Sequence, residues 1–201
     1  MYKRQDNVQC AVIIPVKSFT IAKGRLADTL HADEREKLAR TCAETVVLAA
    51  RPLPTYVVCN DDSVAQWAIA LGANVVTCIT PGLDIAVNAG RTEAIQNGAD
   101  HIIVAHADLP LAVTFEHVVR EGKVTLVPDR HNDGTNVLAF PAHSAFTTAY
   151  GPGSFDNHKR IAQQAGLDCE VINDNMLELD LDTADDLTEL ARRESENDER
   201  E

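Results

Sequence analysis

The aspartates near the C-terminus are the side chains best suited to chemistry. Asp180 and Asp182 stand two positions apart in the run LDLDT, residues 179–183. Because successive side chains of an extended segment point to opposite faces, two carboxylates at this spacing point the same way. Like charges side by side are costly unless they share a cation. We therefore expect Asp180 and Asp182 to be metal ligands, and Asp185 and Asp186 to cap the helix that follows.

A further carboxylate belongs to Asp108, which follows an apolar run and precedes Pro110. A carboxylate at the end of a strand is well placed to hold a metal–phosphate complex. The alternative explanation is that Asp108 only caps a helix. The neighbouring His106 is expected to be structural.

Basic residues gather in the loop after the first strand candidate, where Lys17, Lys23 and Arg25 follow one another closely. The loop matches neither the glycine-rich dinucleotide fingerprint nor the Walker pattern, so cationic side chains would take the place of a glycine cradle. Such cations suit a triphosphate, because they can follow charge onto a pyrophosphate leaving group. Taken alone, the segment is equally consistent with three exposed basic residues.

Two later turns combine glycine with polar side chains. In the first, Gly134 precedes Thr135 and Asn136, and the glycine lets backbone N–H groups approach an anion; a plain hairpin turn explains it as well. In the second, residues 151–154 (GPGS) directly precede a helix candidate, and a helix N-terminus favours a bound anion. A connecting loop capped by Ser154 is the alternative there.

Short apolar runs alternate with amphipathic stretches along the whole chain. The strand candidates are residues 9–16, 55–60, 74–78, 101–107, 124–128, 137–141, 168–172 and 177–181. The helix candidates are residues 33–50, 62–71, 84–97, 113–121, 156–165 and 183–193. This alternation predicts an α/β fold with a mostly parallel, doubly wound sheet and helices on both faces. Ligands of such sheets lie beyond the carboxyl ends of the strands, where the segments described above fall.

The composition is that of a folded domain: 45% of the 201 residues are hydrophobic and 24% are charged. We expect one domain over residues 1–193 and an acidic tail over residues 194–201. The net charge of −13 argues against nucleic-acid binding. Apolar runs too short for a membrane and an N-terminus without a signal pattern predict a cytoplasmic protein. A sheet edge would permit a homodimer, and the scattered cysteines predict reduced thiols.

Taken together, these segments resemble the 2-phospho-L-lactate guanylyltransferase family of coenzyme F-420 biosynthesis, which includes phosphoenolpyruvate and 3-phosphoglycerate guanylyltransferases. The resemblance covers residues 11–190. The motifs that carry it are PVKSFTIAKGRL, ADLP, PDRHNDGTNVL, YGPGSF followed by His158, and LDLDT followed by Asp186 and Leu187. The combination is specific, although the individual pieces are not.

The resemblance implies a nucleotide-diphospho-sugar transferase-like fold of the glycosyltransferase-A type. It implies transfer of GMP from GTP to phosphoenolpyruvate, 2-phospho-L-lactate or 3-phospho-D-glycerate, with release of pyrophosphate and Mg²⁺ as the cofactor. The product would pass to a downstream deazaflavin transferase.

Residue roles follow from the same resemblance. The catalytic residues would be Lys17, Lys23 and Arg25 at the triphosphate, together with Asp108. Mg²⁺ would be held by Asp108, Asp180 and Asp182. The nucleoside would be bordered by Asn60, Gly82 and Asp84. The acceptor would be bound through backbone and hydroxyl groups by Thr135, Gly151 and Ser154.

Two departures from the family pattern affect these expectations. Ala184 stands where the family has proline, which concerns helix initiation, and Asp84 stands where related sequences often carry asparagine, which concerns the guanine contact. Two alternatives to guanylyl transfer remain: another nucleotidyltransferase of the same fold, dependent on CTP or molybdopterin, and a non-catalytic nucleotide-binding domain. A nicotinamide dehydrogenase is disfavoured, because no G-x-G-x-x-G motif follows the first strand candidate.

Overall fold

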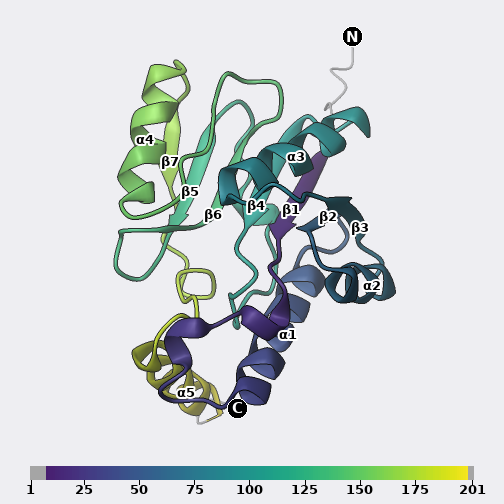
Figure 1. Ribbon diagram of the computed structural model, residues 1–201. Helices are drawn as coiled ribbons and strands as arrows, with labels where there is room; N and C mark the ends of the chain where they lie inside the picture. The colour runs from purple at the N-terminus through teal and green to yellow at the C-terminus, as the bar shows by residue number, and fades with distance from the viewer. Residues whose placement is uncertain (1–7, 199–201) are drawn as a thin grey trace.

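The computed structural model describes residues 8–198 and contains a seven-stranded sheet with the strand order β3-β2-β1-β4-β6-β5-β7 (Figure 1). The strands are β1 (Cys10–Pro15), β2 (Thr55–Cys59), β3 (Asn74–Thr77), β4 (His101–Ala105), β5 (Val124–Pro128), β6 (Thr135–Pro141) and β7 (Cys169–Val171). The helices are α1 (Ala32–Ala49), α2 (Asp62–Ala70), α3 (Leu83–Gln96), α4 (Ser154–Gln164) and α5 (Ala184–Asp198). Short 3-10 turns are η1 (Phe19–Ile21), η2 (Gly24–Leu26) and η3 (Glu116–Val118).

The predicted mostly parallel sheet is confirmed. β1 is parallel to β2 and β4, β2 is parallel to β3, and β5 is parallel to β7. The exception is β6, which is antiparallel to both β4 and β5. The connection between β5 and β6 is a short turn, and a parallel return to the sheet needs a much longer crossover. The start of β6 therefore lies beside the end of β4.

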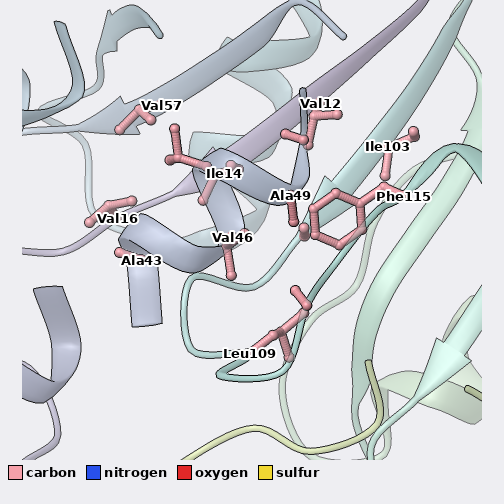
Figure 2. Packing of buried hydrophobic residues seen from close by; sticks show 14 of the residues in the cluster. Val12, Ile14, Val16, Ala43, Val46, Ala49, Val57, Ile103, Leu109 and Phe115 are labelled. Carbon is pink, nitrogen blue, oxygen red and sulfur yellow. The ribbon is translucent and has the colours of Figure 1, made fainter. Parts of the chain in front are cut away.

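Apolar clusters cover both faces of the sheet, as the doubly wound prediction requires. On one face, Val12 and Ile14 of β1 pack with Val46 of α1 and with Phe115 (Figure 2). On the other face, Ile13 packs among buried residues of α3 and α4. This alternation along β1 follows from the period of two in a strand, and it places a helical layer on each side of the sheet.

The close packing of α3 on the sheet depends on Gly90. A Cβ atom at this position would lie 2.7 Å from Ile13 Cγ2 and 2.9 Å from Val58 Cγ2. These distances are shorter than van der Waals contact, so a larger residue would push α3 away from β1 and β2. Since Leu83 at the start of α3 borders the cleft described below, this packing also sets one wall of the site.

Two predicted elements are wrong. Residues 177–181 form the end of a turn and an irregular segment outside the sheet. Leu177, Leu179 and Leu181 are buried, as the alternating pattern indicates. The backbone N–H groups of Leu177 and Glu178 donate to Asp174 O within a turn, and Leu181 N donates to Asp108 O after the end of β4. Alternating burial thus arises here without a strand ladder.

The helix predicted for residues 113–121 is reduced to the 3-10 turn η3. Val113, Thr114, Val118 and Val119 are β-branched residues with low helix propensity, and the Thr114 hydroxyl accepts from the Glu116 N–H, which competes with helical hydrogen bonding.

The acidic tail predicted from residue 194 begins inside α5, which continues to Asp198. Residues 199–201 lie outside the described residues. Within residues 8–198, no helix is both long enough and apolar enough to span a bilayer.

Candidate active site

Three carboxylates meet beyond the end of β4. One oxygen from each of Asp108, Asp180 and Asp182 lies within 4.8 Å of the others. Asp108 lies in the loop three positions after the last residue of β4, and Asp180 and Asp182 come from the segment that leads into α5. The hydrogen bond from Leu181 N to Asp108 O, at 3.1 Å, joins the two segments. The acidic group expected from the spacing of Asp180 and Asp182 thus exists in the fold.

Lys23 supplies a positive charge to this group. Its Nζ atom lies 2.7 Å from Asp108 Oδ2 and 3.5 Å from Asp182 Oδ1, and its side chain is 6% exposed. Burial by itself would raise the pKa of Asp108, but the charges of Lys23 and His106 hold it below the usual value. The backbone of Lys23 has a φ of 57°, a left-handed conformation that non-glycine residues rarely adopt. Lys23 thus combines an unusual backbone conformation just before η2 with two ion pairs to the acidic group.

Negative charge remains in excess around Asp180. Burial, followed by the charges of Asp108 and Asp182, raises the pKa of Asp180 to about 6. Asp108 Oδ1 is buried and has no hydrogen-bond partner within the described residues. Closely spaced carboxylate oxygens, one of them without a partner, are the donor set that Mg²⁺ prefers. The residues present therefore fit a divalent cation.

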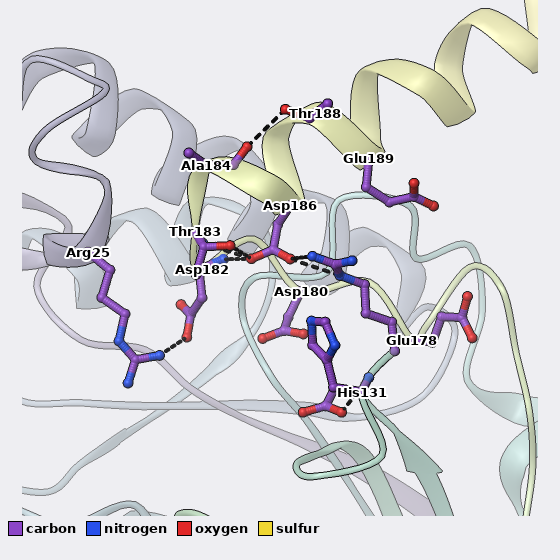
Figure 3. A network of polar contacts seen from close by, with 12 residues as sticks. Arg25, His131, Glu178, Asp180, Asp182, Thr183, Ala184, Asp186, Thr188 and Glu189 are labelled. Atoms are coloured by element: carbon purple, nitrogen blue, oxygen red, sulfur yellow. Dashed lines mark hydrogen bonds and ion pairs between the residues drawn. The ribbon is translucent and has the colours of Figure 1, made fainter.

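An ion pair between Arg130 and Asp186, which we call the Arg130–Asp186 brace, positions the backbone of Asp182. Arg130 Nε and Nη2 donate to Asp186 Oδ1 at 2.9 and 2.7 Å. The second oxygen, Asp186 Oδ2, accepts from Asp182 N at 3.0 Å and from Thr183 N at 2.7 Å. Figure 3 shows the Asp186 carboxylate at the centre of this network, with Asp180 and Asp182 beside it. Asp186 thus caps the start of α5, as expected, and also holds the backbone that carries Asp182.

The side chain of Asn136, near the start of β6, positions Asp180. Asn136 is 1% exposed, and its Nδ2 atom donates to Leu177 O at 3.0 Å and lies 3.4 Å from Asp180 Oδ1. Since His106 N donates to Asn136 O, the start of β6 is tied to the end of β4 as well. Because β6 is antiparallel to β4, its first residues lie at the end of β4, where Asn136 can contact Asp180.

A cleft of about 340 Å³ opens beside Asp108, Asp182 and Lys23. Its polar wall contains Lys17, Lys23, His106, Asp108 and Asp182, and its apolar wall includes Val16, Phe19 and Leu83. Arg25 is on the outside: its side chain is 77% exposed, with Nη1 3.3 Å from Asp182 Oδ2. Of the three expected triphosphate cations, Lys17 and Lys23 line the cleft.

The residues expected at the nucleoside lie at the end of β2 and at the start of α3. Asn60 is exposed at the end of β2. Gly82 has a φ of 134° and precedes α3, whose first residue, Leu83, borders the cleft. Asp84 accepts a hydrogen bond from Tyr150 N at 3.1 Å. Asp84 therefore connects α3 to the glycine-rich loop before α4.

Two of the three residues expected at the acceptor, Thr135 and Ser154, are buried in this fold. Thr135 is fully buried, and its Oγ1 atom is 3.0 Å from His158 Nδ1, with which it shares a hydrogen bond. Ser154 is 2% exposed, whereas Gly151 is exposed. Thr135 and Ser154 are the first residues of β6 and α4 and enter the core with these elements, so a position next to a turn does not by itself expose a side chain.

Sequence reasoning assigned no functional role to His106. Its ring lines the cleft, and its Nε2 atom is buried with no hydrogen-bond partner among residues 8–198. The signal was present, because His106 stands two positions before Asp108 at the end of a strand, which is the same spacing that identified Asp180 and Asp182. No local spacing indicates the pairing of Arg130 with Asp186, which lie 56 positions apart.

The fold and the group of cations and carboxylates at the strand ends together define a nucleotidyltransferase. The same fold is found in a crystal structure described as a nucleotide-diphospho-sugar transferase from Desulfovibrio desulfuricans, with a TM-score of 0.73 and 15% identity over 92% of this chain and 87% of that one. The sequence matches the family model described as "Guanylyl transferase CofC like" over residues 10–201, and the chain belongs to this family.

Two relatives with assigned names support the family at the level of sequence. The phosphoenolpyruvate guanylyltransferase of Sphaerobacter thermophilus is 34% identical over 188 residues, which cover 89% of this chain and 91% of the relative. The 2-phospho-L-lactate guanylyltransferase of Methanoregula boonei is 36% identical over 172 residues, which cover 84% and 76%.

Proposed function

We propose that this protein transfers the guanylyl group of GTP to the phosphate of a three-carbon phosphorylated acid and releases pyrophosphate, as a step of coenzyme F-420 biosynthesis. The observation that carries the proposal is the contact of Lys23 with Asp108 and Asp182 at a cleft of about 340 Å³. The names of the two relatives support GTP as the donor and phosphoenolpyruvate or 2-phospho-L-lactate as the acceptor. Phosphoenolpyruvate is the first acid to test, and 3-phospho-D-glycerate is the third candidate.

Mg²⁺ would be held by Asp108, Asp180 and Asp182. A divalent cation bound there supplies charge neutralisation and Lewis-acid polarisation at phosphate oxygens. Asp108 Oδ1, which has no hydrogen-bond partner among the residues that the structure describes, and the raised pKa of Asp180 support this assignment.

The chain's own residues would act mainly by position and charge. An acceptor phosphate is largely ionised near neutral pH, so it needs no general base and attacks the α-phosphorus of GTP once it is oriented. A new P–O bond forms there as the bond to pyrophosphate breaks. Lys17 and Lys23, with Arg25 at the rim, would meet the charge that develops on the leaving pyrophosphate. The apolar wall around Leu83 would border the nucleoside.

The test combines a nucleotide panel with an acid panel. GTP, CTP, ATP and UTP are each incubated with Mg²⁺ and each of the three acids, and pyrophosphate release is measured. Because the product is unstable, it is trapped with a deazaflavin acceptor and its transferase. We expect release with GTP and one acid, and almost none from Asp108→Ala.

Three outcomes would contradict the proposal or a part of it. Release with CTP in place of GTP would favour a cytidylyltransferase of the same fold. Metal-dependent GTP binding without turnover of any acid would favour a non-catalytic nucleotide-binding domain. Normal turnover by Asp108→Ala would remove the assigned metal role.

A further inference from the structure

The chain segment that carries Asp180 is held by side chains and not by the sheet. Residues 174–182, which we call the carboxylate segment, lie outside the strand ladders. Backbone groups that are not paired within a sheet or helix need other partners, and side chains often supply them. On the side of the sheet, Asn136 Nδ2 donates to Leu177 O at 3.0 Å. A second support comes from α5.

The helix α5 packs against the carboxylate segment along one face. Leu179 and Leu181 of the segment share an apolar cluster with Leu187 and Leu190 of α5. Residues three apart lie on the same face of a helix. Arg193 therefore follows these two leucines on the face that meets the segment, and its side chain is only 16% exposed.

The guanidinium of Arg193 joins α5 to the start of the carboxylate segment. Its Nη2 atom lies 2.8 Å from Glu178 Oε1, and Nη1 donates to Asn175 O. The third nitrogen, Nε, donates to Glu189 Oε1 on α5 itself, which orients the guanidinium. Asn175 and Glu178 stand five and two positions before Asp180. Arg193 thus fixes the backbone that leads directly into this carboxylate.

We propose that Arg193 is a positioning residue for Asp180 and holds it where it shares a divalent cation with Asp108 and Asp182. This inference rests on the proposed function, because it takes over the metal site. Arg193 lies outside the lining of the cleft, so its effect passes through the carboxylate segment. Without the guanidinium, the ion pair to Glu178 and the bond to the turn are lost, and Asp180 gains the freedom that the turn gains.

Arg193→Gln is the test variant, and direct binding of Mn²⁺ is the measurement. Mn²⁺ takes the same oxygen ligands as Mg²⁺, and the free ion is counted by electron paramagnetic resonance without GTP or acid. Groups behind metal ligands change metal affinity by about 10–100-fold, and we expect the Kd of Mn²⁺ to rise about tenfold. Arg193→Lys, which keeps the charge and one donor, recovers part of the affinity.

Arg192→Gln is the matched control on the same helix. Arg192 is adjacent to Arg193, its side chain is 53% exposed, and it pairs with Glu189 and Glu196, which both belong to α5. The variant removes a guanidinium that also contacts Glu189, but it leaves the contacts with the carboxylate segment in place. The Kd of Mn²⁺ should stay at the wild-type value.

A double variant separates positioning from a general effect on the fold. A residue that acts through Asp180 has no further effect once Asp180 is replaced, whereas independent effects add. Arg193→Gln combined with Asp180→Asn should therefore bind Mn²⁺ as weakly as Asp180→Asn alone. A further loss in the double variant overturns the inference. If Arg193→Gln does not fold, Arg193→Lys takes its place in this comparison with the same expected pattern.

Failure of this inference is distinguishable from failure of the proposed function. An Arg193→Gln protein with a lower melting temperature, wild-type affinity for Mn²⁺ and intact guanylyl transfer overturns the role of Arg193 alone. Weaker Mn²⁺ binding by this variant, in a protein whose wild type transfers no guanylyl group, supports the role of Arg193 and overturns the proposed reaction. A wild type that neither binds Mn²⁺ nor transfers GMP overturns both.

Discussion

Lys23 Nζ lies 2.7 Å from Asp108 Oδ2, although the two residues are 85 positions apart in the chain. The contact joins the loop after β1 to the end of β4, which are adjacent parallel strands. It brings the cationic and the acidic segments of the sequence into one site. The cation reduces the repulsion among Asp108, Asp180 and Asp182, and it lies where a triphosphate would need a positive charge.

Lys23 should matter far more to turnover than Arg25. Lys23 is buried against two carboxylates, whereas Arg25 is 77% exposed, and exposed charges are screened by water. We expect Lys23→Gln to lower kcat/KM about 100-fold and Arg25→Gln to lower it less than about tenfold. Steady-state kinetics with saturating Mg²⁺ measure both. A larger loss in Arg25→Gln would contradict the assignment of Lys23 to the triphosphate.

Asp180 should make stability depend on pH and Mg²⁺. Its pKa of about 6 is above that of an unfolded aspartate, so the folded chain binds more protons between about pH 4 and 6. The free energy of unfolding contributed by this group therefore falls as pH rises through that window. Without Mg²⁺ and near pH 7.5, Asp180→Asn should be more stable than the wild type by about 1–2 kcal/mol, and the difference should vanish near pH 4.

Urea denaturation with and without Mg²⁺ tests this prediction. Mg²⁺ should stabilise the wild type and have little effect on Asp180→Asn, because a ligand has been lost. Asp185→Asn is the control, since Asp185 is exposed in the first turn of α5. Equal stabilisation of wild type and Asp180→Asn by Mg²⁺ would exclude Asp180 as a ligand.

Disrupting the Arg130–Asp186 brace should raise the Mg²⁺ concentration that the protein needs for activity. Arg130→Lys keeps the charge but cannot donate through two nitrogens to one carboxylate. We expect it to raise the Mg²⁺ concentration for half-maximal activity several-fold, and Asp186→Asn to raise it about tenfold and to destabilise the fold by about 1–3 kcal/mol. Activity titrations with Mg²⁺ separate the two effects. Reduced stability with an unchanged Mg²⁺ requirement would make the brace purely structural.

Gly90→Ala should destabilise the protein, although alanine normally favours a helix over glycine. The new methyl group would lie 2.7 Å from Ile13 Cγ2, and overpacking of this kind costs about 1–3 kcal/mol. The variant should also raise the KM for GTP, because α3 carries Leu83 in the cleft wall. Urea denaturation and kinetics measure these effects, with Asn88→Ala on the exposed side of α3 as the control. A more stable Gly90→Ala protein would contradict the packing described.

The local features of the sequence were sufficient for most elements and for part of the site. Alternation of strand and helix patterns predicted the α/β sheet, because the period of buried residues reflects the geometry of each element. The spacing of Asp180 and Asp182 predicted two carboxylates on one side. The position of Asp108 after an apolar strand placed it at the carboxyl end of that strand.

Tertiary structure decided which of these groups meet and which are hidden. The order of strands brings Lys23 to Asp108, and the antiparallel entry of β6 places Asn136 beside Asp180 while burying Thr135. The leucines of residues 177–181 alternate in burial without pairing in the sheet. The physical reason is the separation of the interacting residues along the chain. Sequence periodicity reflects which residues a few positions apart share a face of one element. A contact such as that of Arg130 with Asp186 depends on how distant segments pack.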